Sequence, residues 1–111
     1  MSPIEELAIR QLAAYNRADL DAFCACYHPE VQVWDGEVQV LTGHEAFRQR
    51  YAATFGRGRF GATVDQRLIS GVHCVDREQY WVDGAEGRTS GEVLVRYRLI
   101  DDTIGVVQFL R

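Results

Sequence analysis

The pattern of apolar and polar positions that most strongly predicts strands lies in the last third of the chain, residues 90–111. Two runs rich in β-branched, aromatic and arginine residues flank Asp101-Asp102, which predicts an antiparallel hairpin with a short acidic turn. Alternate residues share a face, so the first run places Val93, Val95, Tyr97 and Leu99 on one side and Leu94, Arg96, Arg98 and Ile100 on the other. Because both faces carry apolar side chains, we expect helices to cover one face and a second subunit the other.

The first 30 residues predict two helices. Ser2 is a candidate N-cap with Pro3 in the first turn, and the following apolar stripe runs to Tyr15 with Gln11 among its members. Asp19 is expected to cap a second, short helix that extends to Tyr27 and ends at His28-Pro29.

The middle of the chain predicts a hairpin, a helix and two long strands. Residues 31–34 and 38–41 alternate on either side of the turn signal Asp35-Gly36. Thr42 and Glu45 have the spacing of a capping box, so a third helix should begin there and end before Gly56. Residues 60–70 and 72–82 are expected to be strands. This order of helices followed by strands indicates an α+β domain with helices on one face of an antiparallel sheet.

Length and charge narrow the possible functions. A chain of 111 residues forms one domain, residues 1–111, and its net charge of −4 disfavours binding to nucleic acid. No apolar run approaches the roughly 20 residues of a membrane span, and the N-terminus lacks the pattern of a signal peptide. Cys24, Cys26 and Cys74 are odd in number, which fits a reducing, cytoplasmic location. We expect no metal and no cofactor.

Four stretches of the chain resemble the nuclear transport factor 2-like superfamily, and within it the SnoaL-like and steroid-isomerase-like proteins. They are 14–23 with Asn-Arg-Ala-Asp-Leu-Asp, 27–31, 41–47 with Thr-Gly-His-Glu-Ala-Phe, and the terminal Val-Gln-Phe-Leu-Arg. The resemblance implies a cone-shaped, curved antiparallel sheet with three N-terminal helices enclosing a pocket, and a homodimer through the outer sheet face. The superfamily includes isomerases, polyketide cyclases, epoxide hydrolases, dehydratases and binding proteins.

The steroid-isomerase pattern carries over only in part. The resemblance aligns Asp35 with the general base of that family, and it aligns Gln11 with a tyrosine of the oxyanion hole. Val95 stands where the family has a protonated aspartic acid, a hydrogen-bond donor that a valine cannot replace. Because loss of an oxyanion-hole donor costs about 3 to 4 kcal/mol of transition-state stabilisation, steroid isomerisation is disfavoured.

The candidate catalytic residues are Asp35, Gln11 and Tyr15. A carboxylate at the mouth of an apolar pocket is suited to take a proton, although Asp-Gly between two strands is also a common turn signal. Gln11, Tyr15 or Arg77 would polarise the substrate. The predicted substrate pocket consists of Trp34, Phe55, Arg77, Trp81, Tyr97, Phe109 and Arg111.

The assignments of Arg77 and Arg111 to the pocket depend on which face of each strand points toward the helices. The resemblance places His73, Val75, Arg77, Gln79 and Trp81 on the pocket side of their strand; a register shifted by one residue would instead put Arg77 in solvent. Arg111 either frays as a terminal residue or is ordered, in which case it pairs with Asp35 or holds a substrate carboxylate.

These observations predict a protein that binds a small hydrophobic molecule, with an isomerase, cyclase or hydrolase activity that uses Asp35 as general base. The alternatives are a non-catalytic pocket that binds a hydrophobic ligand and a dimeric scaffold whose interior is filled by its own side chains.

Overall fold

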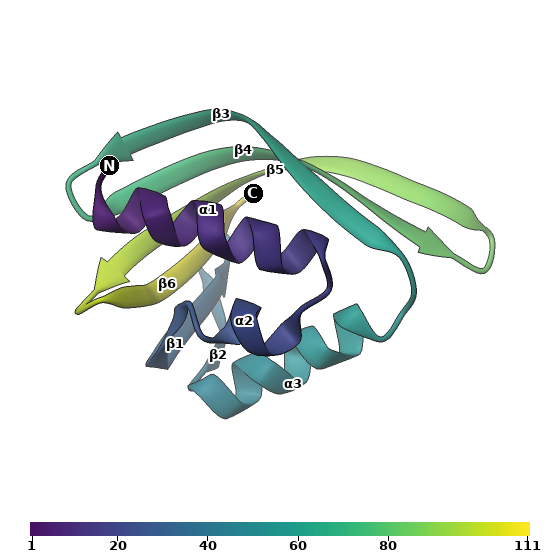
Figure 1. Ribbon diagram of the computed structural model, residues 1–111, viewed down its shortest axis with the longest axis horizontal. Helices are drawn as coiled ribbons and strands as arrows, with labels where there is room; N and C mark the ends of the chain where they lie inside the picture. Colours follow the sequence, from purple (N-terminus) through teal and green to yellow (C-terminus); the bar gives the residue numbers. More distant parts are fainter.

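The computed structural model describes all 111 residues, which form three helices and six strands (Figure 1). The helices are α1 (Pro3–Asn16), α2 (Leu20–Cys24) and α3 (His44–Phe55). The strands are β1 (Tyr27–Asp35), β2 (Val38–Thr42), β3 (Phe60–Ser70), β4 (His73–Gly84), β5 (Gly87–Ile100) and β6 (Thr103–Leu110). The α+β architecture expected from the order of elements is confirmed.

The strands form one curved sheet that does not close, in the order β2-β1-β6-β5-β4-β3. Neighbouring strands are antiparallel except β1 and β6, which are parallel. The sequence analysis did not anticipate this parallel pair, because β1 and β6 are separated by most of the chain and no local turn links them. In Figure 1 the sheet arches over the three helices, which all lie on its concave side.

The ends of the first two helices form as expected, but the second helix is shorter. The Ser2 hydroxyl accepts a hydrogen bond from the Glu5 amide at 3.3 Å, and Asp19 accepts one from the Ala22 amide at 3.1 Å. The prediction that the second helix reaches Tyr27 is wrong, because Tyr27 and Pro29 belong to β1. Pro29 is tolerated in β1 because residues 28–31 pair with neither neighbouring strand. The absent N–H of proline therefore breaks no hydrogen bond of the sheet.

The predicted capping box of the third helix is also wrong. Thr42 ends β2, where it pairs with Gln32, and the N-cap of α3 is Gly43, whose φ of 96° favours glycine. No side chain caps this helix. The Gly43 amide instead donates to the Val31 carbonyl at 2.8 Å, which ties the start of α3 to β1.

Asn16 fixes the end of α1 against the edge strand of the sheet. Its side-chain amide donates to the Ala62 carbonyl at 2.9 Å and accepts from the Ala62 amide at 2.8 Å. This two-point contact mimics a strand pair and joins α1 to β3. It therefore sets the position of the helix face that carries Gln11 and Tyr15.

The face of β4 that points toward the helices differs from the one expected. Cys74 and Asp76 are fully buried, whereas Arg77 is exposed. Asp76 pairs across the ladder with Val95, a core residue, while Arg77 pairs with the exposed Leu94. Cross-strand partners share a face, so the pocket side of β4 is the one with Asp76, and the predicted face was off by one residue.

Candidate functional site

The concave side of the sheet contains a cavity of about 100 Å³ between α1, α2, α3 and the strands. Most of its lining is apolar or aromatic. The lining residues are Gln11, Leu12, Tyr15, Phe23, Tyr27, Tyr51, Glu78, Tyr97, Val107 and Phe109. Leu12, Tyr15, Glu78 and Phe109 are partly exposed, so part of the lining faces solvent.

Glu78 is the one ionisable carboxyl group in the lining. Burial raises its pKa to about 7, and the charge of nearby Asp76 adds to this effect. No arginine or hydrogen-bond donor of the protein counters this shift. The sequence analysis missed Glu78 because it assigned the wrong face of β4 to the pocket. Cys74, Asp76 and Glu78 alternate along β4 and so share one face. Because two of the three are acids, the pattern is typical of a face exposed to solvent.

Gln11 joins two tyrosine hydroxyl groups beneath the cavity. Its carbonyl oxygen accepts from the Tyr27 hydroxyl at 2.9 Å, and its amide nitrogen donates to the Ala8 carbonyl at 3.1 Å and the Tyr97 hydroxyl at 3.3 Å. Both amide protons of Gln11 are thus engaged within the protein. Tyr97 accepts from Gln11, which leaves the Tyr97 hydroxyl proton for another acceptor. Burial raises the pKa of Tyr27 and of Tyr97 well above the usual value, so both remain neutral donors.

Tyr15 and Tyr51 bring two further hydroxyl groups to the cavity. Burial raises the pKa of each to about 12, and the negative charge of Glu78 contributes to both shifts. The Tyr15 ring packs against Phe55 and Phe60, with ring centroids 5.6 and 4.7 Å away. Phe55 therefore supports Tyr15 and is not part of the lining itself.

An ion pair lies next to Glu78 on the same face of β4. The Asp76 carboxylate, 1% exposed, accepts two hydrogen bonds from the Arg67 guanidinium at 2.7 and 2.9 Å. The Cys74 thiol donates to the same carboxylate at 3.3 Å. Burial, followed by the charge of Asp76, raises the pKa of Cys74 to about 12, so this thiol is not a nucleophile at neutral pH.

Asp35 lies at the rim of the sheet and does not line the cavity. It pairs across the β1–β6 ladder with Phe109, a cavity residue, so both side chains project from the same face. The Arg111 Nε atom donates to the Asp35 carboxylate at 2.7 Å. Arg111 is therefore placed against Asp35, the pairing that the sequence analysis raised as an alternative to a substrate carboxylate. Both side chains remain more than half exposed, at 57% and 52%.

Five of the seven residues predicted for the pocket lie outside its lining: Phe55 and Arg111, described above, and Trp34, Arg77 and Trp81. Arg77 contacts Glu92 at 2.7 Å on the outer face, and the Trp34 indole donates to Gln32 at 3.1 Å. Trp81 lies under the Arg88 guanidinium, 3.9 Å from the ring centroid. Of the predicted site residues, the structure brings together Gln11, Tyr15, Tyr97 and Phe109 around the cavity.

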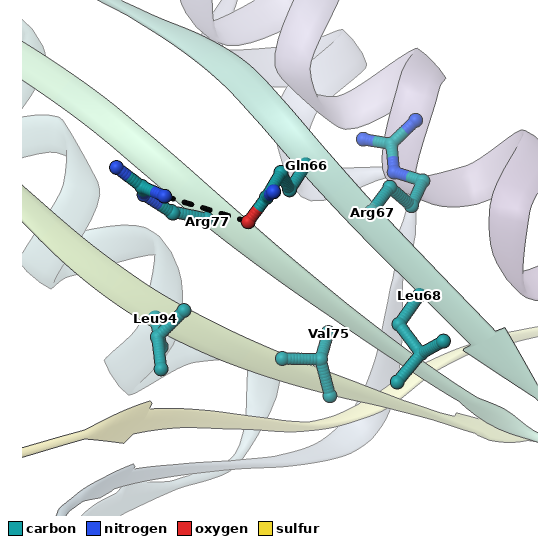
Figure 2. Close-up of a pocket in the computed structure, with 6 residues that line it drawn as sticks. All are labelled: Gln66, Arg67, Leu68, Val75, Arg77 and Leu94. Atoms are coloured by element: carbon teal, nitrogen blue, oxygen red, sulfur yellow. Dashed lines mark hydrogen bonds between the residues drawn. The ribbon is translucent and has the colours of Figure 1, made fainter.

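The outer face carries a shallow groove of about 490 Å³ (Figure 2). Figure 2 shows Leu68, Val75 and Leu94 on three neighbouring strands, with Arg77 and Gln66 joined by a hydrogen bond of 3.4 Å. The Arg67 side chain turns away from these residues toward the helical side. The groove brings no unpaired ionisable group near its apolar residues, so the interior cavity is the better candidate for chemistry.

Two classes of site find no counterpart in the structure. No group of three or more His, Cys, Asp or Glu side chains is arranged to hold a metal ion. None of the helices is both long enough and apolar enough to span a membrane.

Comparison with known proteins places the chain in a family. A comparison with curated proteins finds no sequence match. A cystatin-fold protein from Novosphingobium aromaticivorans has a similar structure, with a TM-score of 0.87 and 26% identity over 100% of this chain and 99% of that chain. The Δ5-3-ketosteroid isomerase from a Mycobacterium species has a TM-score of 0.89 and 15% identity over 100% and 94% of the two chains.

A third similar structure is a Mycobacterium tuberculosis protein in complex with estradiol-17β-hemisuccinate, with a TM-score of 0.88 and 13% identity over 98% and 93% of the two chains. At such identities the likeness establishes the fold alone. The SnoaL-like domain model matches residues 8–105, nearly the whole length. The chain therefore belongs to the SnoaL-like domain family of the nuclear transport factor 2-like superfamily.

Proposed function

We propose that this SnoaL-like domain binds a compact, largely apolar organic molecule in its interior cavity, and that Glu78 transfers a proton to or from that molecule. The observation that carries the proposal is the pKa of about 7 for a carboxyl group inside a tyrosine-lined cavity. A general base or acid works best when its pKa lies near the working pH. Glu78 is then partly ionised at neutral pH and is able to act in either direction.

The tyrosines are proposed to hold the polar end of the ligand. The Tyr97 hydroxyl already accepts from Gln11, so its proton is free to be donated to a ligand oxygen. Tyr15 offers a second donor from α1. In this scheme Gln11 is a positioning residue that orients Tyr97, whereas the sequence analysis placed Gln11 in direct contact with the substrate.

Cavity size supports a small ligand over a steroid. Drug-sized ligands occupy pockets of roughly 300 to 1,000 Å³, whereas this cavity is about 100 Å³. A steroid nucleus is rigid and cannot compress to that volume. The likeness to a ketosteroid isomerase therefore does not extend, in this proposal, to a steroid substrate. A larger molecule would place only one end in the cavity.

Asp35 remains the competing candidate for the base. Its side chain projects from the same face as Phe109, but it is half exposed and already paired with Arg111. Asp35 is thus exposed and engaged by a partner, whereas Glu78 lies in the cavity lining without one. The competing class of function is a pocket that binds its ligand without chemistry, as the tyrosine-rich lining would also allow.

Hydrogen–deuterium exchange into a small ketone tests the proposal without knowledge of the natural substrate. The protein is incubated with 2-butanone in D₂O at neutral pD, and loss of the α-proton signals is followed by NMR. We expect exchange above the buffer rate for the wild type and for Asp35→Asn, and at the buffer rate for Glu78→Gln. Loss in Asp35→Asn alone would transfer the role to Asp35. Buffer-level exchange in every protein would favour the non-catalytic pocket.

We further propose that the domain forms a homodimer through the outer sheet face. Leu68 and Leu94 are 69% and 42% exposed there and lie next to Val75 on neighbouring strands. Exposed apolar residues that gather on one face mark an interaction surface. Sedimentation velocity at micromolar concentration should show a dimer for the wild type and a monomer for Leu94→Glu, which would place an unpaired charge in the interface. A monomeric wild type would refute the proposal.

A further inference from the structure

We propose that the interior cavity selects its ligand by charge: it prefers small organic cations, accepts uncharged molecules and excludes anions. This inference rests on the proposed binding function of the same cavity, and it adds the class of ligand. It does not depend on whether Glu78 performs catalysis. It differs from an anion site at Arg111, one of the alternatives raised from the sequence.

The composition of the lining provides the first argument. Glu78 is the only lining residue that carries a charge near neutral pH, and the lining contains no lysine, arginine or histidine. An anion in this cavity would lose its hydration without gaining a counter-ion, and it would face the Glu78 carboxylate. A cation would pair with that carboxylate in a half-buried site, where the attraction is stronger than in water.

The basic residues closest to the cavity do not offer an anion a counter-ion. The positive charge of Arg67 is neutralised by Asp76 through two hydrogen bonds. Arg111 at the rim is paired with Asp35. Arg50, which lies close enough to Tyr51 to influence its hydroxyl, is exposed on α3 and does not line the cavity. Of these three basic residues, two are thus paired with acids, and Arg50, the unpaired one, lies outside the lining.

The aromatic lining provides the third argument. The side chains of Tyr15, Phe23, Tyr27, Tyr51, Tyr97 and Phe109 supply six rings around a small volume. The face of an aromatic ring attracts cations, and this attraction strengthens when the cation loses water. A compact alkylammonium group can thus gain from the rings as well as from Glu78, whereas an uncharged group of the same shape gains from apolar contact alone.

The groups that face Glu78 determine how this selection depends on pH. Asp76 lies on the same strand, and Tyr15, Tyr51, Tyr27 and Tyr97 face it from α1, α3, β1 and β5. The tyrosines stay neutral below pH 10 because their pKa values are raised. Of the lining residues, only Glu78 changes charge between pH 5.5 and 8.5, so the preference for cations should be strong at pH 8.5 and weak at pH 5.5.

Three compounds that share a tert-butyl group test the inference: tert-butylammonium, pivalamide and pivalate, which are cationic, neutral and anionic. Their binding to the full chain is measured by NMR titration of the ¹³C-labelled tyrosine rings and the Glu78 carboxyl at pH 8.5. We expect tert-butylammonium to bind about tenfold more tightly than pivalamide, and pivalate about tenfold more weakly. Glu78→Gln, which keeps the size of the side chain, should bring the three affinities together.

The outcomes separate the inference from the proposed function. Pivalate binding as well as pivalamide, or equal binding of all three to the wild type, would overturn charge selection but leave a binding cavity. Failure of all three compounds to bind at millimolar concentration would overturn both proposals. If Glu78→Gln does not fold, the wild type at pH 5.5 replaces it, because protonation also removes the carboxylate charge. Preference for the ammonium that persists unchanged at pH 5.5 would exclude Glu78 as its source.

Discussion

The two faces of β4 use the same kinds of charged residue in opposite ways. On the inner face, Asp76 is almost completely buried, and Arg67 is its only ionic partner, through two short hydrogen bonds. On the outer face, Arg77 is 43% exposed and forms ion pairs with Glu92 at 2.7 Å and with Asp65 at 3.6 Å. A buried charge requires its partner, because solvent cannot replace it, whereas an exposed charge has water as an alternative. The Arg67–Asp76 and Arg77–Glu92 pairs both measure 2.7 Å, but loss of the buried pair should lower the free energy of unfolding more.

Removal of the inner partner should have the largest effect on stability. Asp76→Ala leaves the Arg67 guanidinium in a mostly buried position without its carboxylate, and it also removes the acceptor of the Cys74 thiol. We expect the free energy of unfolding to fall by about 3 to 5 kcal/mol. Urea denaturation followed by circular dichroism measures the change. A loss below about 1 kcal/mol would mean that the two faces are energetically alike.

The pH dependence of stability should show that Glu78 is a buried acid. The Glu78 pKa is about 7 in the folded protein and 4.5 for an unperturbed glutamate, so the folded state holds this proton more tightly. Stability contributed by the group is therefore lost as pH rises from about 4.5 to about 7 and is constant above that. We expect wild type to lose about 2 kcal/mol over this range relative to Glu78→Gln.

Urea denaturation of wild type and Glu78→Gln at pH 5 and pH 8 measures this difference. Effects of pH on any other group occur in both proteins and drop out when the two are compared. If the free energy of unfolding changed equally with pH in the two proteins, the raised pKa of Glu78 would be contradicted. The outer-face acid Glu92 supplies a matched control, because Arg77 lowers the pKa of Glu92 and so shifts it in the opposite direction. Glu92→Gln should leave the loss between pH 5 and pH 8 unchanged.

Removal of an outer partner should have the smallest effect. Arg77→Gln breaks the contact with Glu92 and with Asp65, but all three side chains can be hydrated in place. We expect a change in the free energy of unfolding within about 1 kcal/mol. Urea denaturation under the conditions used for Asp76→Ala gives the comparison. A loss as large as that of Asp76→Ala would show that the outer face is covered, as in the proposed dimer.

Local patterns predicted much of this fold. The caps at Ser2 and Asp19, the long strands and the turn at Asp101-Asp102 depend on neighbours in the chain, and the structure has each of them. Asp101 adopts a φ of 54°, as a tight turn of this kind requires. The fold class and the family could be predicted for the same reason, because they follow from the order of elements and from short motifs.

The candidate site was less accessible, because its members meet only after strands pair. Gln11, Tyr15, Tyr97 and Phe109 were predicted and lie around the cavity. Glu78 was missed and Arg77 was misplaced through one error, the choice of face along β4. Alternation tells which residues share a face, but both faces of this strand mix polar and apolar side chains, so the sequence has no preference between them.

The sequence by itself predicted the α+β fold class and the order of elements, two helices, a short hairpin, a third helix and four long strands. It could do so because propensity, capping and periodicity are properties of neighbouring residues. Only the tertiary structure decided that Asp76 and Glu78 point inward. The reason is the pairing of β4 with β5, which sets Asp76 beside Val95, together with the arrival of Arg67 from β3 as a counter-ion. The fully buried Asp76 carboxylate needs such a distant partner, and no residue near Asp76 in the sequence predicts that Arg67 will supply it. Glu78 has no counter-ion, and burial raises its pKa instead.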